Sequence, residues 1–209
     1  MKKTFILSLA MLAVLPAMAQ KRAFTIEDVY RVKYVSSPTV SRDGVLAYGV
    51  TRQNLRAQKT YSNIVVKVPE AGAIVGWSKG ETKQITTDDK SFSPFWSQDG
   101  KTLYHLSSAD GTTQVYRYEH GKSVKVTDYA LGIQGPVLSP DGNLIAFAAE
   151  VFPEIGGADG KANKEAMAKK ARNPIQAHVA DELLFRHWTD YTDGKYWHII
   201  VYDMTKKTY

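Results

Sequence analysis

The chain repeats one phrase three times: Pro-Thr-Val-Ser-Arg-Asp-Gly at residues 38–44, Pro-Phe-Trp-Ser-Gln-Asp-Gly at 94–100 and Pro-Val-Leu-Ser-Pro-Asp-Gly at 136–142. Proline disfavours helix both for itself and for the residue before it, so Pro-x-x-Ser predicts a short extended strand. Ser-x-Asp-Gly predicts a turn, because Asp and Ser side chains bond nearby backbone groups and Gly readily takes a positive φ. An apolar run follows each turn and predicts a second, buried strand.

The second unit contains a whole four-stranded sheet. Its strands are predicted at about residues 93–97, 102–108, 112–119 and 123–127, separated by Asp-Gly or His-Gly turns. Pro94 and Pro136 lie 42 residues apart, within the period of β-propeller blades. The sequence therefore predicts an all-β fold, a partial β-propeller of about three four-stranded blades with a short helical insertion. The blades are predicted at residues 38–90, 94–132 and 136–209.

Two insertions interrupt the repeat. Residues 69–80 add length between the third and fourth strands of the first unit, where insertions map to loops on one face. In the third unit, Ala-rich residues 164–171 predict a short exposed helix, and the third strand resumes only at about 197–203. The fourth strand of this unit is expected to begin where the sequence stops, at Tyr209.

Residues 1–19 are predicted to be a signal peptide. Lys2 and Lys3 precede an apolar stretch at 5–15, and Ala-Met-Ala at 17–19 matches a cleavage site. The apolar stretch is too short to span a bilayer, and no later one is long enough. We therefore expect an exported, periplasmic or secreted protein whose residues 20–209 form an incomplete propeller domain, without a membrane segment.

Composition narrows the chemistry further. The chain has no cysteine, which excludes disulfides, thiol catalysis and a lipoprotein anchor. The formal net charge is +6, of which Lys2 and Lys3 contribute two. A basic run at 161–172 is interpreted as a solvated loop or helix rather than a site for an anionic partner, because no aromatic-interleaved stripe accompanies it. No nucleic-acid partner is predicted.

The segment Asp-Glu-Leu-Leu-Phe-Arg-His-Trp at residues 181–188 is the most specific part of the chain. Together with Phe-Thr-Ile-Glu-Asp-Val at 24–29 and the repeated turns, it resembles the propeller of secreted peptidases of the prolyl oligopeptidase family. The similarity is strongest to the dipeptidyl-peptidase 5 and acylaminoacyl-peptidase branch, and it covers essentially the whole chain after the signal peptide.

This resemblance implies hydrolysis of peptides near their N-terminus. In that family a seven-bladed propeller precedes an α/β-hydrolase domain that holds the catalytic Ser, Asp and His, so no catalytic residue is assigned to this chain. We expect a propeller fragment that lacks the hydrolase domain and is inert alone, with that domain and peptide substrates as its partners. Three blades would leave two open faces, which predicts poor solubility or self-association.

The substrate-binding residues suggested by the resemblance are Glu182, Asp181 and Arg186. A buried peptide ammonium needs a carboxylate partner, which Glu182 or Asp181 would supply, and Arg186 would bind a carbonyl or carboxylate. The structural alternative is a helical turn in which Glu182 pairs with Arg186 at i, i+4 while Trp188 packs against the sheet.

Two further patterns are interpreted as structural. Gly-Trp-Ser-Lys-Gly at 76–80 satisfies G-x-S-x-G, but a nucleophile elbow needs a helix after the serine, and a strand pattern follows here. His187 and His198 lack metal-ligand spacing, and His105 and His120 are placed in a strand and in a turn. No metal or other cofactor is predicted.

A function of another class stays open. The turn chemistry is also similar to that of TolB-type periplasmic propellers, so the chain could be a stand-alone exported propeller that binds other proteins.

Overall fold

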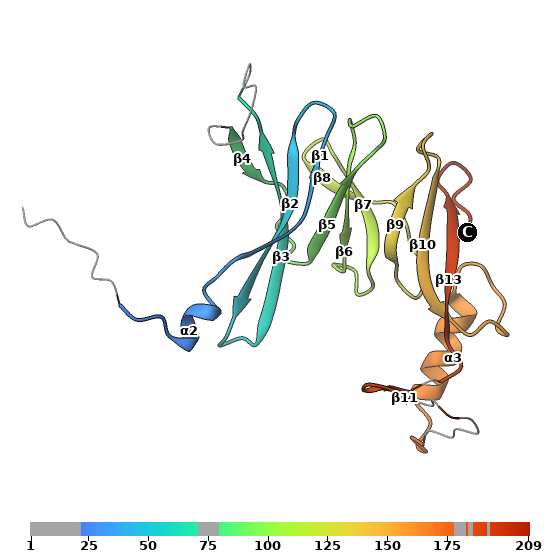
Figure 1. The fold of residues 1–209 in the computed structure, drawn as a ribbon. Helices are drawn as coiled ribbons and strands as arrows, with labels where there is room; N and C mark the ends of the chain where they lie inside the picture. The colour runs from blue at the N-terminus through green and yellow to red at the C-terminus, as the bar shows by residue number, and fades with distance from the viewer. Residues whose placement is uncertain (1–21, 71–79, 178–182, 184–185, 192) are drawn as a thin grey trace, which may run out of the picture.

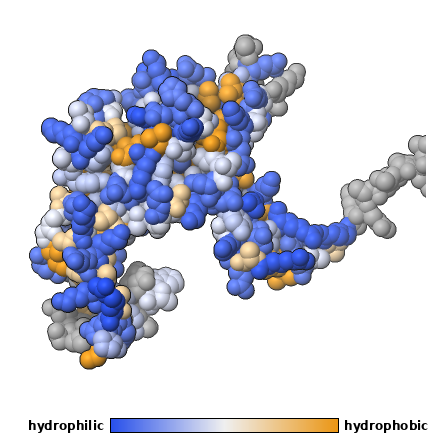
Figure 2. Space-filling view, turned by 180° about the vertical axis from the view of Figure 1, so that it is seen from behind, coloured by the Kyte–Doolittle hydropathy of each residue, from blue (hydrophilic) through white to orange (hydrophobic). Residues whose placement is uncertain are grey.

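The computed structural model describes residues 22–70, 80–177, 183, 186–191 and 193–209. Within these residues, no helix has the length and apolar character needed to cross a membrane. The predicted signal peptide, residues 1–19, lies outside the described residues. Three antiparallel sheets stand in a row, as Figure 1 shows, and the space-filling view in Figure 2 shows a mostly hydrophilic surface with separate hydrophobic patches over the sheets.

The first two sheets each have four strands, and the strands pair in sequence order. A short helix, α2 (Ile26–Val29), precedes them. The strands of the first sheet are β1 (Tyr34–Val40), β2 (Leu46–Asn54), β3 (Lys59–Val68) and β4 (Glu81–Gln84). Those of the second are β5 (Ser91–Trp96), β6 (Leu103–Ser107), β7 (Gln114–Glu119) and β8 (Lys122–Lys125). The four strands predicted in the second unit are confirmed.

The third sheet has three strands among the described residues: β9 (Gln134–Leu138), β10 (Leu144–Val151) and β13 (Tyr196–Asp203). Between β10 and β13 lie α3 (Lys161–Ala171), β11 (Arg186–His187) and β12 (Asp190–Tyr191). The predicted helical insertion is confirmed, and it begins three residues earlier than expected, next to a bond from the Lys161 N–H to Asp159. The fold is thus a partial propeller, as predicted.

The repeated phrase forms a similar turn in each sheet, and the first turn is closed one residue earlier than the other two. The backbone N–H groups of Ser41, Ser97 and Ser139 donate to the carbonyls of Val45, Thr102 and Leu144. The N–H groups of those same three residues donate back to the serine hydroxyls. The glycines of the turns have φ between 73° and 79°, which explains why glycine ends each phrase.

A second repeated feature precedes each phrase and was not predicted. The residue before the first proline, which is Ser37, Ser93 or Gly135, has a positive φ of 49°, 47° or 55°. The strand register shifts at the same place in all three sheets, between β1, β5 or β9 and its neighbour. This bulge re-aims the first strand of each sheet.

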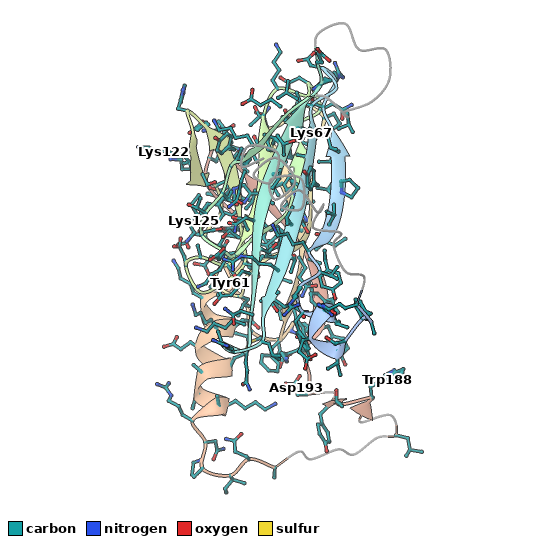
Figure 3. All side chains as sticks on the ribbon, turned by 90° about the vertical axis from the view of Figure 1, so that its left-hand side faces the viewer. Tyr61, Lys67, Lys122, Lys125, Trp188 and Asp193 are labelled. Carbon is teal, nitrogen blue, oxygen red and sulfur yellow. The ribbon has the colours of Figure 1, made fainter. Side chains whose placement is uncertain are left out.

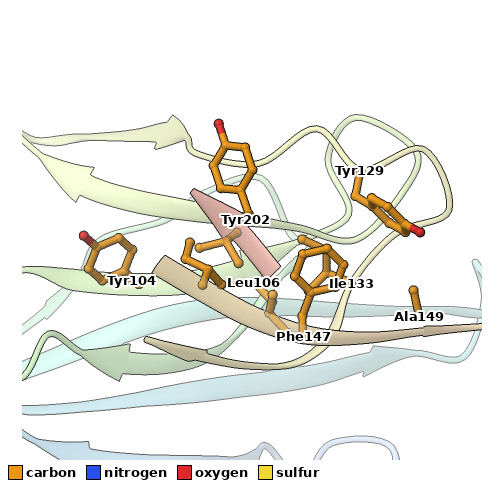
Figure 4. Packing of buried hydrophobic residues seen from close by; sticks show 9 residues of the cluster. Tyr104, Leu106, Tyr129, Ile133, Phe147, Ala149 and Tyr202 are labelled. Carbon is orange, nitrogen blue, oxygen red and sulfur yellow. The ribbon is translucent and has the colours of Figure 1, made fainter. Parts of the chain in front are cut away.

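The core lies between adjacent sheets. Leu103 of β6 packs with Ala47 and Ile64 of the first sheet. Tyr104 and Leu106 point to the other side, toward Ile145 and Phe147 of the third sheet, as Figure 4 shows for Tyr104, Leu106 and Phe147. Because side chains alternate along a strand, the second sheet is covered on both faces.

His105 is buried in this second sheet, at the position that holds Tyr48 in the first sheet and Phe147 in the third. Its Nε2 lies 2.8 Å from the Ser123 hydroxyl, and Nδ1 lies 3.2 Å from the Leu106 carbonyl. The pKa of His105 is lowered, because burial disfavours the charged ring more than the Leu106 carbonyl and Asp88 favour it.

The lowered pKa predicts a pH-dependent stability. Below the ordinary value of 6.5 the unfolded chain binds the proton more readily than the folded chain, so stability falls as the pH drops through 6.5. His105→Phe should therefore shrink the loss of Tm between pH 7.5 and pH 5, as measured by circular dichroism. His198→Phe, at an exposed histidine of β13, is the control, and an equal change in both variants would contradict this role of His105.

Candidate functional site

The candidate site is the connection between β10 and β13, which carries the segment that the sequence marks as most specific. β11 and β12 form a short hairpin with two residues in each strand, in which Arg186 pairs with Tyr191 and His187 with Asp190. Trp188 stands in the turn with a φ of 56° and is 83% exposed. Figure 3 shows the Trp188 side chain on the far side of the hairpin from α3.

A group of four charged side chains fixes the C-terminal end of this hairpin to the sheet and to α3. Lys195 Nζ lies 3.1 Å from Glu150 Oε2 of β10 and 3.6 Å from Asp193 Oδ2. Lys170 Nζ of α3 lies 3.6 Å from the same Asp193 oxygen. The Lys195 and Asp193 side chains are about three quarters buried, so the pair between them is less screened than a surface pair.

The protonation of Lys195 reflects these neighbours. Burial works against its charge, but the hydrogen bond to Glu150 and the charge of Asp193 outweigh burial and raise its pKa. Lys195 therefore stays charged and joins β10 to the chain that leaves the hairpin.

A cavity of about 350 Å³ opens beside these ion pairs. It lies between the turn before β7, the turn before β9 and the start of β13, and Met167 of α3 closes one side. Thr113, Gln134, Glu150, Lys195 and Trp197 are among the residues that line it. The cavity combines hydrogen-bonding groups with one large aromatic ring.

Of the three predicted substrate-binding residues, one lies within the described residues. Asp181 and Glu182 lie outside the described residues, and Arg186 lies in β11. The predicted packing of Trp188 against the sheet is wrong, because Trp188 is 83% exposed, and Arg186 lies in a strand. The other residues of the helical-turn alternative, 181, 182, 184 and 185, lie outside the described residues. The left-handed turn at Trp188 reverses the chain, so β11 and β12 form a hairpin.

The ion pairs that anchor this hairpin were not predicted from the sequence. Glu150 and Lys195 are 45 residues apart, so no local spacing connects them. One available signal was the Asp193-Gly194 dipeptide, which marks a turn. Gly194 has a φ of 87°, in the left-handed region that favours glycine.

The structure describes part of the Gly-Trp-Ser-Lys-Gly pattern and of the histidines that were interpreted as structural. The strand predicted after Gly-Trp-Ser-Lys-Gly is confirmed as β4, while residues 76–79 lie outside the described residues. His105 lies in β6, and His120 lies between β7 and β8 with a φ of 48°, as predicted. In the part of the chain that the structure describes, no three His, Asp or Glu side chains gather as a metal site.

No protein-family model matches the chain. The uncharacterized peptidase YuxL of Bacillus subtilis is 30% identical over 160 residues, covering 75% of this chain and 23% of that protein. The Tol-Pal system protein TolB of Francisella tularensis is 39% identical over 64 residues, covering 30% of this chain and 15% of that protein.

Among solved structures, the acylaminoacyl peptidase of Pyrococcus horikoshii is similar with a TM-score of 0.63 and 17% identity, over 89% of this chain and 25% of that one. At 17% identity, this similarity shows that the two chains share a fold over the matched part. The chain spans about a quarter of the length of the peptidases it matches. The chain therefore resembles the N-terminal propeller part of serine peptidases of the prolyl oligopeptidase family, as its sequence predicts.

Proposed function

We propose that this chain is the propeller part of an exported serine peptidase that cleaves peptides near their N-terminus, of the dipeptidyl-peptidase or acylaminoacyl-peptidase type. The observation that carries the proposal is the 30% identity with a peptidase over 160 residues. In this proposal the catalytic Ser, Asp and His belong to an α/β-hydrolase domain outside this sequence, so the chain alone does not hydrolyse peptides. Export rests on the signal peptide predicted at residues 1–19.

The hairpin segment would contribute to the substrate pocket. Glu182, or Asp181 next to it, would bind the peptide ammonium, and Arg186 would bind a substrate carbonyl or carboxylate. One feature supports this role: the ion pairs of Lys195 hold the residues that follow the hairpin in place. A pocket residue needs such a fixed support, because misplacement by about 1 Å weakens binding and catalysis.

A second candidate function is an exported binding module similar to TolB. The 39% identity with a TolB protein over 64 residues favours it, although that match covers less of the chain than the peptidase match. A binding module would need no nucleophile anywhere in the polypeptide, which separates the two proposals experimentally.

Labelling with a biotinylated fluorophosphonate tests the peptidase. The probe is attacked by an activated serine, which forms a bond to phosphorus and releases fluoride. In an extract of the exported fraction of source cells, we expect a labelled polypeptide that contains tryptic peptides of this chain and begins at Gln20. A heat-denatured extract is the control. Recovery of this chain only in unlabelled polypeptides would favour the binding module and contradict the peptidase.

A further inference from the structure

One stripe of α3 contacts the rest of the chain, and two of its four residues are polar. Asn163, Ala166, Met167 and Lys170 follow the i, i+3, i+4, i+7 spacing of one helix face. Asn163 is 2% exposed, Ala166 and Met167 are half-buried, and all other residues of α3 are exposed. Two half-buried apolar side chains bury little area, so polar contacts determine how α3 lies against the sheets.

Asn163 binds the first turn of α3 to the end of β10. Its Oδ1 accepts the Phe152 N–H at 2.6 Å, and its Nδ2 donates to the Ile155 carbonyl at 2.9 Å. Both ends of the side-chain amide are therefore hydrogen-bonded at a position that is shielded from water. Such a contact sets the orientation of the helix and is costly to lose.

The start of α3 also lies against the loop that follows the second sheet. The Ala130 N–H donates to the Asp159 carbonyl at 3.3 Å. A Cβ at Gly160 would lie 2.9 Å from Tyr129 Cζ, so the chain approaches this ring closely. The N-terminal end of α3 is thus held at the junction of the second and third sheets. Because this junction is inside the row of sheets, additional blades of a longer polypeptide would not cover or replace it.

The C-terminal end of α3 contacts the chain that leaves the hairpin. Lys170 Nζ lies 3.6 Å from Asp193 Oδ2 and 5.8 Å from the centre of the Phe152 ring. Gly194 approaches the same ring, since a Cβ there would lie 3.7 Å from Phe152 Cδ1. Phe152, which is 8% exposed, is therefore the common contact of α3 and of the residues that follow β12.

The β11–β12 hairpin needs support from outside itself. It has two residue pairs, and an isolated two-stranded hairpin is marginally stable at best in water. Figures 1 and 3 show α3 and the hairpin beyond the same end of the third sheet. Asp193, two residues after β12, forms its ion pairs with Lys170 and Lys195. Support of the hairpin therefore includes a direct contact with α3.

We propose that α3 is a support helix that positions the β11–β12 hairpin, with Asn163 and Lys170 as the positioning residues. Asn163 fixes the helix to the junction of the sheets, and Lys170 connects the fixed helix to Asp193. The support itself belongs to the fold of this chain. Its effect on substrate binding rests on the proposed function, in which the hairpin segment contributes to the substrate pocket.

Amide hydrogen exchange of β11 and β12 in the complete polypeptide tests the support, because it measures how often the hairpin opens. Lys170→Met should speed this exchange about 2- to 5-fold through loss of one partly exposed ion pair, and Lys170→Arg should restore the normal rate. Asn163→Ala should speed it about 10-fold, because two buried hydrogen bonds are lost although alanine favours helix. Lys169→Met and Lys164→Ala, at exposed positions of α3, are the matched controls and should leave the rate unchanged.

The double variant Asn163→Ala/Lys170→Met separates a support helix from two unrelated contacts. If Asn163 acts through Lys170, the double variant should exchange no faster than Asn163→Ala alone, whereas independent contacts would multiply the two effects. Multiplied effects would overturn the proposal, and so would normal exchange of the hairpin in Lys170→Met. Cooperative melting would verify that each variant is folded. Lys170 is exposed, so its variants still decide the question if Asn163→Ala does not fold.

Kinetics of the complete polypeptide test the consequence for the proposed peptidase. Lys170→Met should raise KM for a peptide about 2- to 5-fold and change kcat by less than about 2-fold, because the hairpin would bind the peptide and hold no catalytic group. A lower kcat at unchanged KM would contradict a role in positioning the pocket. A polypeptide that hydrolyses no peptide would overturn the peptidase proposal, and the exchange rates would still show whether α3 supports the hairpin.

Discussion

Gln114→Ala is expected to lower the free energy of unfolding by about 3 kcal/mol, because several buried groups depend on this one side chain. The amide nitrogen of Gln114 donates to the Tyr129 carbonyl at 2.7 Å. Its oxygen accepts bonds from the Thr127 hydroxyl and the Tyr129 N–H at 2.9 and 3.0 Å. Alanine would leave these polar groups unpaired where water does not reach, at about 1–3 kcal/mol each before relaxation.

The bonds of Gln114 also hold β8 and the following loop to β7. The Thr127 hydroxyl, which donates to Gln114, accepts the Val115 N–H at 2.9 Å. The first sheet repeats the arrangement, since the Thr86 hydroxyl donates to Asn63 and accepts the Ile64 N–H. An amide on the third strand and a threonine after the fourth thus join the outer strand to the sheet in both sheets.

Urea unfolding monitored by tryptophan fluorescence would measure the effect of Gln114→Ala. Gln98→Ala, at an exposed residue of the repeated turn, is the matched control and should change the unfolding free energy by less than about 0.5 kcal/mol. Equal midpoints for the two variants would show that the network around Gln114 contributes nothing to stability.

The turns that shape the sheets depend on short-range hydrogen bonds, which can be recognised in the sequence. Ser97, Asp99 and Gly100 form their turn with hydrogen bonds among themselves and to Thr102, so a short window of sequence contains all the groups that make the turn. The Asp-Gly dipeptide at 110–111 likewise marks its turn without reference to distant residues. The first two sheets were predictable because each is built from strands that are adjacent in sequence, whereas in the third sheet β13 pairs with β10 across the insertion.

The candidate site was less predictable because its geometry depends on distant residues. Glu150 and Lys195 lie on opposite sides of the insertion, and no sequence pattern near either residue indicates that they pair. The β11–β12 hairpin has only two residues per strand, too few to show the alternation of polar and apolar residues that indicates a strand. Its turn places Trp188 in the left-handed backbone region, with a φ of 56°. A run of Leu, Phe, His and Trp is compatible with helix and with strand, so composition could not decide between them.

Glu182→Gln in the complete peptidase is expected to lower kcat/KM by about 10- to 100-fold for peptides with a free N-terminus. A hydrogen bond to a charged group contributes about 1.5–3 kcal/mol, and each 1.4 kcal/mol is a factor of ten. Gln keeps the size of the side chain and removes the charge that would pair with the ammonium. This prediction rests on the proposed function and on the residue that the family resemblance suggests.

A change of substrate separates binding of the ammonium from a structural role of Glu182. Acetylation removes the positive charge of the peptide, so the same variant should lose little activity toward the acetylated peptide. Glu165→Gln, at an exposed carboxylate of α3, is the matched control and should leave both activities unchanged. Equal losses on the free and the acetylated peptide would indicate that Glu182 supports the fold of the segment instead of binding the ammonium. Unchanged activity on both would remove Glu182 from the substrate pocket, and the same pair of substrates would then be applied to Asp181→Asn.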